Sequence, residues 1–204
     1  MNKRIPYSIF HIPYSAKKGF TLIELLVSIT IFTVMTGIVL AKYNTYNTNA
    51  PFVNASEDIV LALRHAQVYG AGSKGNIVGC GAGTTFECSY GVFFSTAAAE
   101  KNGLTIFVDT NNDRRFTSGA DSIVERIRWA SPISINTLSC PGSVGTCSST
   151  VSVTFRRPNP DAFINDTVSF PAVSYPAATV SIVNANSGRT ATVMISQAGQ
   201  ISLQ

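Results

Sequence analysis

KKGFTLIELLVSI, residues 17–29, places two lysines and a glycine directly before an apolar run that contains one glutamate. The apolar run extends from Phe20 to Leu40, and Glu24 is its one ionisable side chain. Because an α-helix rises about 1.5 Å per residue, a helix over this run would span about 30 Å, the thickness of the hydrocarbon core of a membrane. The segment therefore predicts a transmembrane helix with Lys17 and Lys18 on the cytoplasmic side.

Glu24 distinguishes this helix from two simpler kinds of membrane segment. A secretory signal peptide has a shorter apolar region, a small-residue cleavage site and no acid inside it. A plain signal anchor explains the lysines, but it gives no reason to place a carboxylate in hydrocarbon at a cost of about 2.5–3.5 kcal/mol. If the chain is cut between Gly19 and Phe20, the new α-amino group of a neighbouring copy could neutralise the carboxylate. Glu24 therefore indicates a role in assembly.

KKG at residues 17–19 is followed by FTLIELL at residues 20–26. This order resembles the processing motif of type IV prepilins and of the pseudopilins of type II secretion. The resemblance implies that a prepilin peptidase cuts after Gly19 and that the exposed Phe20 is N-methylated. It also implies that Glu24 meets the N-terminal amine of an adjacent subunit in a filament.

A second helical pattern follows the apolar run. A polar patch that contains Pro51 ends the run, and helical periodicity returns over residues 53–70. The apolar residues that share one face of this helix are Ile59, Leu63, Ala66 and Tyr69. We expect one long helix whose second half is amphipathic, with Pro51 kinking or interrupting it and Asn49 capping the restart.

After Gly70 the pattern changes to short β-type runs separated by turn residues. Val151, Val153 and Phe155 alternate with polar residues, as in a half-buried strand. The expected strands cover residues 90–95, 104–109, 122–129, 150–156, 178–184, 190–196 and 199–203. These runs predict an antiparallel sheet that packs on the amphipathic half of the helix.

The fold class predicted from these patterns is α+β, with a pilin-like fold in which a long N-terminal helix packs on a C-terminal antiparallel β-sheet head. We expect a cleaved leader at residues 1–19 and a transmembrane and assembly helix at 20–42. An amphipathic helix half at 43–70 and a periplasmic β-rich head at 71–204 would follow.

The composition and the charge limit the class of function. With 45% hydrophobic and 13% charged residues, the chain can bury a core and does not belong to the disordered class. Four of its 15 basic residues precede Phe20, so 11 basic side chains face 11 acidic ones in the remainder. The net charge of +4 therefore belongs to the leader, and the rest of the chain has no overall charge that favours nucleic acid.

Four cysteines form two close pairs in sequence, Cys80 with Cys88 and Cys140 with Cys147. Zinc sites usually need tighter spacing, and neither histidine lies near a cysteine, so disulfides are favoured over a metal. Because short loops close at a small entropic cost, we expect the local pairing, which requires an oxidising compartment.

DTNNDRRFTSGAD, residues 109–121, places Asp109, Asn111 and Asp113 at alternate positions, like the opening of a calcium loop. Arg114 stands where such a loop needs glycine, and the twelfth position is an alanine. The pattern therefore favours an Asx-rich turn between two strands, with calcium as a weaker candidate and no other cofactor expected.

The sequence carries no pattern that is typical of an enzyme. It has no nucleophile elbow and no serine triad, and its two histidines lie on opposite sides of the membrane segment. FRRPNPDAF, residues 155–163, is explained by a strand that runs into a rigid turn, with contact to a partner as the alternative.

Several looser stretches resemble the H-type, FimT-like branch of the pseudopilins. They are RHAQVYG at residues 64–70, the run at residues 107–127 and the final hairpin. Gln200 stands where members of this branch often carry arginine, and Arg189 is the basic residue that remains close. This departure disfavours a DNA partner.

The resemblance implies a structural subunit, a minor pilin or pseudopilin, of a type IV pilus or a type II secretion pseudopilus. Its expected partners are other pilin subunits, the prepilin peptidase, an inner-membrane assembly platform and membrane lipid. The expected location is the inner membrane, crossed once, with the head outside. The alternatives are a filament-tip module that contacts DNA, a surface or secreted cargo, and a membrane-anchored periplasmic protein that never assembles.

Overall fold

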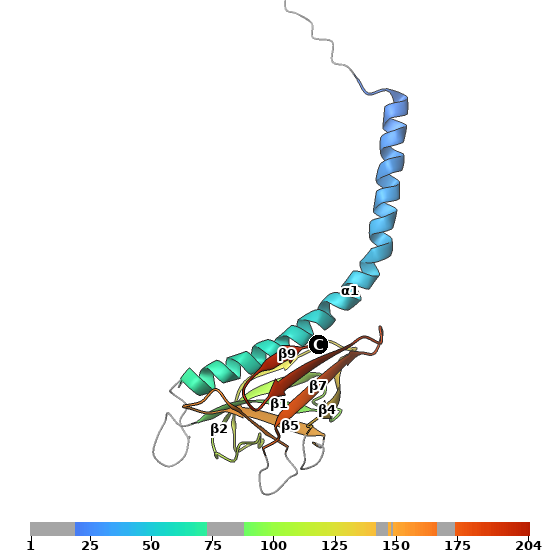
Figure 1. Ribbon diagram of the computed structural model, residues 1–204. Coiled ribbons are helices and arrows are strands. Elements are labelled where there is room, and N and C mark those ends of the chain that lie inside the picture. The colour runs from blue at the N-terminus through green and yellow to red at the C-terminus, as the bar shows by residue number, and fades with distance from the viewer. Residues whose placement is uncertain (1–18, 73–87, 142–146, 148, 167–173) are drawn as a thin grey trace, which may run out of the picture. The chain divides into compact units, whose positions relative to one another are not determined.

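The computed structural model describes residues 19–72, 88–141, 147, 149–166 and 174–204. The chain divides into two compact units, Met1–Asn44 and Thr45–Gln204. One helix, α1 at Leu22–Gly72, begins in the first unit and ends in the second, and the strands lie in the second unit (Figure 1). The predicted α+β class with a long N-terminal helix is confirmed.

The first turn of α1 is capped by Thr21. The backbone N–H of Glu24 donates to the Thr21 hydroxyl oxygen at 3.3 Å, and the N–H of Leu25 donates to the Thr21 carbonyl at 3.1 Å. Threonine is a favoured N-cap because its side chain satisfies one of the orphan N–H groups of the first turn. The helix therefore begins directly after the predicted processing site.

The apolar part of α1 is long enough to cross a membrane. Among the described residues, the stretch Leu22–Tyr43 has a mean hydropathy of 2.2 over its most apolar window, and none of that window is buried within the protein. Its hydroxyls bond back to carbonyls of the preceding turn: Ser28 to Glu24, Thr30 to Val27, Thr33 to Ile29 and Thr36 to Phe32. These polar groups are satisfied inside the helix, as hydrocarbon surroundings require.

The helix continues through Pro51, so an interruption there and the expected capping of a restart by Asn49 are wrong, whereas the kink expected as the alternative stays a prediction. Proline removes one helical hydrogen bond. Phe52 and Ala55, one and four residues after it, are buried in the core at 4% and 1% exposure, which holds the next turn in place. The burial of these side chains therefore outweighs the tendency of Pro51 to end the helix.

The second part of α1 buries one face. The buried side chains recur at helical spacing, and they are Phe52, Ala55, Ile59, Ala62, Leu63 and Ala66. All six belong to one hydrophobic cluster that also contains residues of both sheets. The amphipathic half of α1 predicted from the sequence therefore covers one side of the hydrophobic core.

The first sheet has five antiparallel strands in the order β3-β2-β1-β5-β6. The bounds are β1 Ser89–Ser95, β2 Gly103–Asp109, β3 Ser122–Arg128, β5 Thr150–Phe155 and β6 Ala162–Asn165. On β1 the side chains of Tyr90, Val92 and Phe94 enter the main cluster. Phe93 lies on the other face with Phe107 and Phe116, so the centre of this sheet is covered on both sides.

The second sheet has four antiparallel strands in the order β4-β7-β8-β9. The bounds are β4 Ile133–Ser139, β7 Ala177–Asn184, β8 Thr190–Ser196 and β9 Ile201–Leu203. Each of the seven expected runs falls on a strand, whereas β4 and β6 were not expected. The structure also divides the strands between two sheets.

Polar contacts tie α1 to the strands and turns. The indole N–H of Trp129 donates to the carboxylate of Asp58 at 3.2 Å. The side-chain amide of Gln67 donates to the carbonyls of Pro160 at 3.2 Å and Gly199 at 3.1 Å. Three segments far apart in the sequence therefore meet at Gln67.

At Gly70, α1 lies very close to the backbone of the first sheet. A Cβ atom at this position would lie 2.5 Å from the carbonyl oxygen of Phe155 and 2.8 Å from its carbonyl carbon. These are backbone atoms of β5, which cannot turn aside as the end of a side chain can. Glycine is therefore required here by contact with β5.

We expect Gly70→Ala to destabilise the protein by about 1–3 kcal/mol, because overpacking against backbone outweighs the gain of about 1 kcal/mol in helix propensity. Thermal unfolding of the full chain in non-ionic detergent, followed by circular dichroism, measures this effect. Gly72→Ala is the matched control, since a Cβ atom there meets nothing within 4 Å. A melting temperature for Gly70→Ala equal to that of the control would contradict the close packing.

Candidate functional site

The predicted processing site lies in exposed chain directly before α1. Gly19 and Phe20 are outside the helix, and the Phe20 side chain is 82% exposed. A Cβ atom on Gly19 would meet nothing within 4 Å. Within the described residues, no contact shields the bond between Gly19 and Phe20, so a protease can reach it. Lys17 and Lys18 lie outside the described residues.

Glu24 is the third residue of α1 and its side chain is exposed. This position lies in the first turn, where the partial positive charge of the helix end favours a carboxylate. Thr21 and Glu24 also have the spacing of a capping box, in which the acid at the third helical position faces the N-cap. This pattern is visible in the sequence, and it adds a local reason for an acid at this position.

The apolar side chains that follow Glu24 are exposed in the single chain. They include Phe32 at 72%, Met35 at 65% and Leu40 at 65% exposure. An exposed apolar surface of this length requires lipid or other protein around it. The arrangement can therefore anchor the chain in a membrane and can pack against other helices of its kind.

The cysteines lie in the second unit. Cys140 and Cys147 form the expected disulfide, with their Cα atoms 5.2 Å apart, and it closes a short loop after β4. Cys88, directly before β1, is also disulfide-bonded. Cys80 lies outside the described residues, so its predicted pairing with Cys88 remains a prediction.

The segment between β2 and β3 folds around the carboxylate of Asp109. This side chain is 1% exposed, and it accepts the backbone N–H groups of Asp113 at 3.1 Å and Arg114 at 2.9 Å. Asp113 in turn accepts the N–H of Arg115 at 2.9 Å. Asn112 and Arg114 have positive φ angles of 60° and 63°, the left-handed conformation that tight turns use. The predicted Asx-rich turn is therefore confirmed.

Asp121 closes the same loop from its other end. Its carboxylate accepts the N–H of Thr110 at 3.0 Å and the N–H of Thr117 at 2.6 Å. The hydroxyl of Thr110 donates to the carbonyl of Ala120. Phe116, at the tip, packs on Phe93 and covers the outer face of the first sheet.

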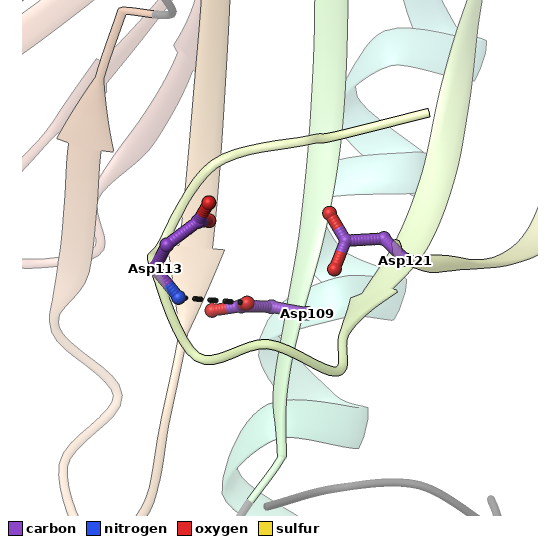
Figure 2. Close-up of side chains that lie close together, drawn as sticks. All are labelled: Asp109, Asp113 and Asp121. Carbon is purple, nitrogen blue, oxygen red and sulfur yellow. Dashed lines mark hydrogen bonds between the residues drawn. The ribbon is translucent and has the colours of Figure 1, made fainter. Parts of the chain in front are cut away.

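Three carboxylates meet in this loop. Figure 2 shows Asp109, Asp113 and Asp121, and one ligand oxygen from each lies within 4.8 Å of the other two. Burial, opposed by the N–H of Arg114 and aided by the charges of Asp121 and Asp113, raises the pKa of Asp109 to about 6. Burial also raises the pKa of Asp121, although the N–H groups of Thr117 and Thr110 oppose it.

The cluster differs in one member from the calcium set expected from the sequence. Asp109 and Asp113 belong to both, but Asp121 stands where Asn111 was expected. The amide of Asn111 instead donates to the Asp113 carboxylate at 2.9 Å. Three oxygens of this kind could hold a hard divalent cation. All three carboxylates already accept backbone N–H groups that order the turn, so calcium binding remains a prediction from the sequence.

The N-terminal segment is similar to known proteins. Residues 14–40 match a family model described as the prokaryotic N-terminal methylation motif. No curated protein and no solved structure matches the chain. The match supports a type IV pilin-like protein, and it marks the chain as a substrate of prepilin-type processing.

We expect the stability of the protein to rise as the pH falls from 7 toward 5. The folded pKa of Asp109 is about 6, above the unfolded value of 3.8, so the folded state binds the proton more tightly between these values. The gain down to pH 5 is about 1.4 kcal/mol, because pH 5 lies about one unit below the folded pKa and each unit contributes about 1.4 kcal/mol. Thermal melts of the full chain in EDTA, at several pH values, measure it.

Asp109→Asn should reduce this pH dependence, because the variant has no carboxylate at position 109 to take up a proton. Glu100→Gln removes an exposed carboxylate elsewhere in the same unit and is the matched control. An equal pH slope in the unsubstituted chain and in Asp109→Asn would show that the proton binds elsewhere.

Proposed function

We propose that this chain is a structural subunit, a minor pilin or H-type pseudopilin, of a type IV pilus or a type II secretion pseudopilus. The observation that carries the proposal is the methylation motif at residues 14–40. The exposed bond between Gly19 and Phe20, directly before the Thr21 cap, supports it. A peptidase at the membrane surface would meet this bond outside the helix.

The subunit would cross the inner membrane once, through the apolar part of α1, with the β-rich head outside. The length and hydropathy of Leu22–Tyr43 support this location. The disulfide between Cys140 and Cys147 supports an oxidising compartment for the head. The inner-membrane assembly platform and other pilin subunits would be its partners.

Assembly would bury the apolar side chains of α1 against the helices of neighbouring subunits. The exposed side chains of Phe32, Met35 and Leu40 support this role, because an apolar surface of this kind needs lipid or other protein around it. Once Gly19 is removed, the new amine of Phe20 in one subunit could pair with Glu24 of another. In the low dielectric of a filament core, this pair would be stronger than in water.

We expect the mature chain to begin at methylated Phe20, and mass spectrometry of the mature N-terminus measures this. Gly19→Ala, or a bulkier change such as Gly19→Val, should leave full-length precursor because the peptidase cuts after this residue. Gly37→Ala is the matched control, since a Cβ atom there also meets nothing within 4 Å. A mature chain that keeps Met1, or one that is cut near Leu40, would overturn the proposal.

We also expect Glu24→Ala and Glu24→Gln to be inserted and processed normally but to enter filaments poorly, by about tenfold or more. A lost hydrogen bond between charged groups costs about 1.5–3 kcal/mol, which corresponds to this factor. The measurement is the fraction of mature subunit in sheared filaments against the fraction left in membranes, at matched expression.

The glutamine variant separates two roles of Glu24. Glutamine serves as well as glutamate at the third position of a capping box, so the helix end is kept while the charge is lost. Glu57→Gln, at an exposed position of α1 in the second unit, is the control for loss of a carboxylate. Equal incorporation of all these chains would show that Glu24 does not drive assembly.

A further inference from the structure

A cavity of about 210 Å³ lies at the edge of the first sheet, within the second unit. It forms where the start of β1, the end of β5 and the start of β6 come together, since Tyr90 pairs with Phe155 and Phe155 with Ala162. The segment between β2 and β3 and the residue after β8 complete its wall through Arg114 and Gln197.

The lining of this cavity is basic. Arg114, Arg156 and Arg157 contribute three guanidinium groups, and Asp161 contributes one carboxylate. The ionisable side chains of the lining thus carry a net charge of +2. This excess is local, because basic and acidic residues balance over the chain from Phe20 onward.

Two of the arginines are held in place by their neighbours. The guanidinium of Arg114 lies over the ring of Phe163, 4.2 Å from its centroid, in a cation–π contact. Nη1 of Arg156 donates to the side-chain oxygen of Asn112 at 3.1 Å. Because the Asp109 carboxylate holds the backbone of Arg114, the ordered turn after β2 fixes this side of the cavity.

A buried hydroxyl lies in the same lining. Ser89 is 0% exposed and lines the cavity. Its Oγ has no hydrogen-bond partner among the described residues. A buried polar group without a partner costs free energy, so its presence beside three arginines indicates that a ligand completes its hydrogen bonding.

We propose that this cavity binds a compact oxyanion, a phosphate or a carboxylate, between the three arginines and Ser89. Guanidinium groups recognise both kinds of oxyanion through paired N–H donors. The volume equals about seven water molecules at about 30 Å³ each, which is enough for a small anion. Binding here would not depend on filament assembly.

The test uses the full chain in non-ionic detergent, with isothermal titration calorimetry at constant ionic strength. One arm titrates inorganic phosphate and the other titrates succinate, so the two arms tell which oxyanion is preferred. We expect saturable binding at one site in at least one arm, with a Kd of about 1 mM or tighter. Absence of saturable binding in both arms would overturn the proposal.

Arg157→Gln should weaken binding by about tenfold or more, because it removes charge-assisted hydrogen bonds. Arg157 is exposed and follows β5, so the substitution leaves the core intact. Arg126→Gln, an exposed arginine on β3 outside this lining, is the matched control and should bind as the unsubstituted chain does. Equal weakening by both substitutions would show that the anion follows overall charge, and it would overturn the site.

Ser89→Ala tests the role of the Ser89 hydroxyl with two measurements, which should change in opposite directions. Removal of an unpartnered buried hydroxyl should raise the melting temperature of the anion-free protein while it weakens binding of the preferred anion several-fold. A general loss of structure would lower both the melting temperature and the affinity for the anion. If Ser89→Ala binds either anion as tightly as the unsubstituted chain, the hydroxyl is not part of the site and the assignment is wrong.

Discussion

The burial of one face of α1 against both sheets is the contact on which the rest of the second unit depends. Ile59, Leu63 and Ala66 are 0% exposed, and they share a cluster with residues from both sheets. Alanines alternate with larger side chains on this face, so the helix approaches the sheets closely, and at Gly70 it meets the backbone of β5. Because burial of apolar area is the main favourable term of folding, sheets without this helix would lose the buried side chains that it adds to their shared cluster.

The C-terminal end of α1 also positions the residues that line the basic cavity. Gly70 sets the distance to Phe155, the last residue of β5, and Arg156 and Arg157 follow directly. Three residues before Gly70, Gln67 holds the carbonyls of Pro160 and Gly199. The turn that carries two of the arginines is thus fixed at both ends by α1. The packing of α1 against β5 therefore determines the geometry of the cavity lined by Arg156 and Arg157.

The elements that sequence reasoning found are those whose burial leaves a periodic pattern, such as the amphipathic part of α1 and the strands with buried aromatic side chains. β4 was missed because it is an edge strand of mostly polar residues, ISINTLS, and only its first half is buried. β6 has four residues, too few to show a period. Asp121 joins the carboxylate cluster because the turn folds back on itself through Asn112 and Arg114, a conformation that the spacing of acids does not reveal.

The polar groups of the apolar segment show why Glu24 depends on its surroundings. From Leu22 to Leu40, the hydroxyls of Ser28, Thr30, Thr33 and Thr36 donate to carbonyls of their own helix, so they need nothing from outside. An ionised carboxylate has no proton to donate, so it cannot form a hydrogen bond to a carbonyl of its own helix. The positive end of the helix stabilises it by about 0.3–1 kcal/mol, less than the cost of about 2.5–3.5 kcal/mol in hydrocarbon. The remaining stabilisation of the Glu24 carboxylate must come from its surroundings. A cation at the level of the first turn is the group that would supply it.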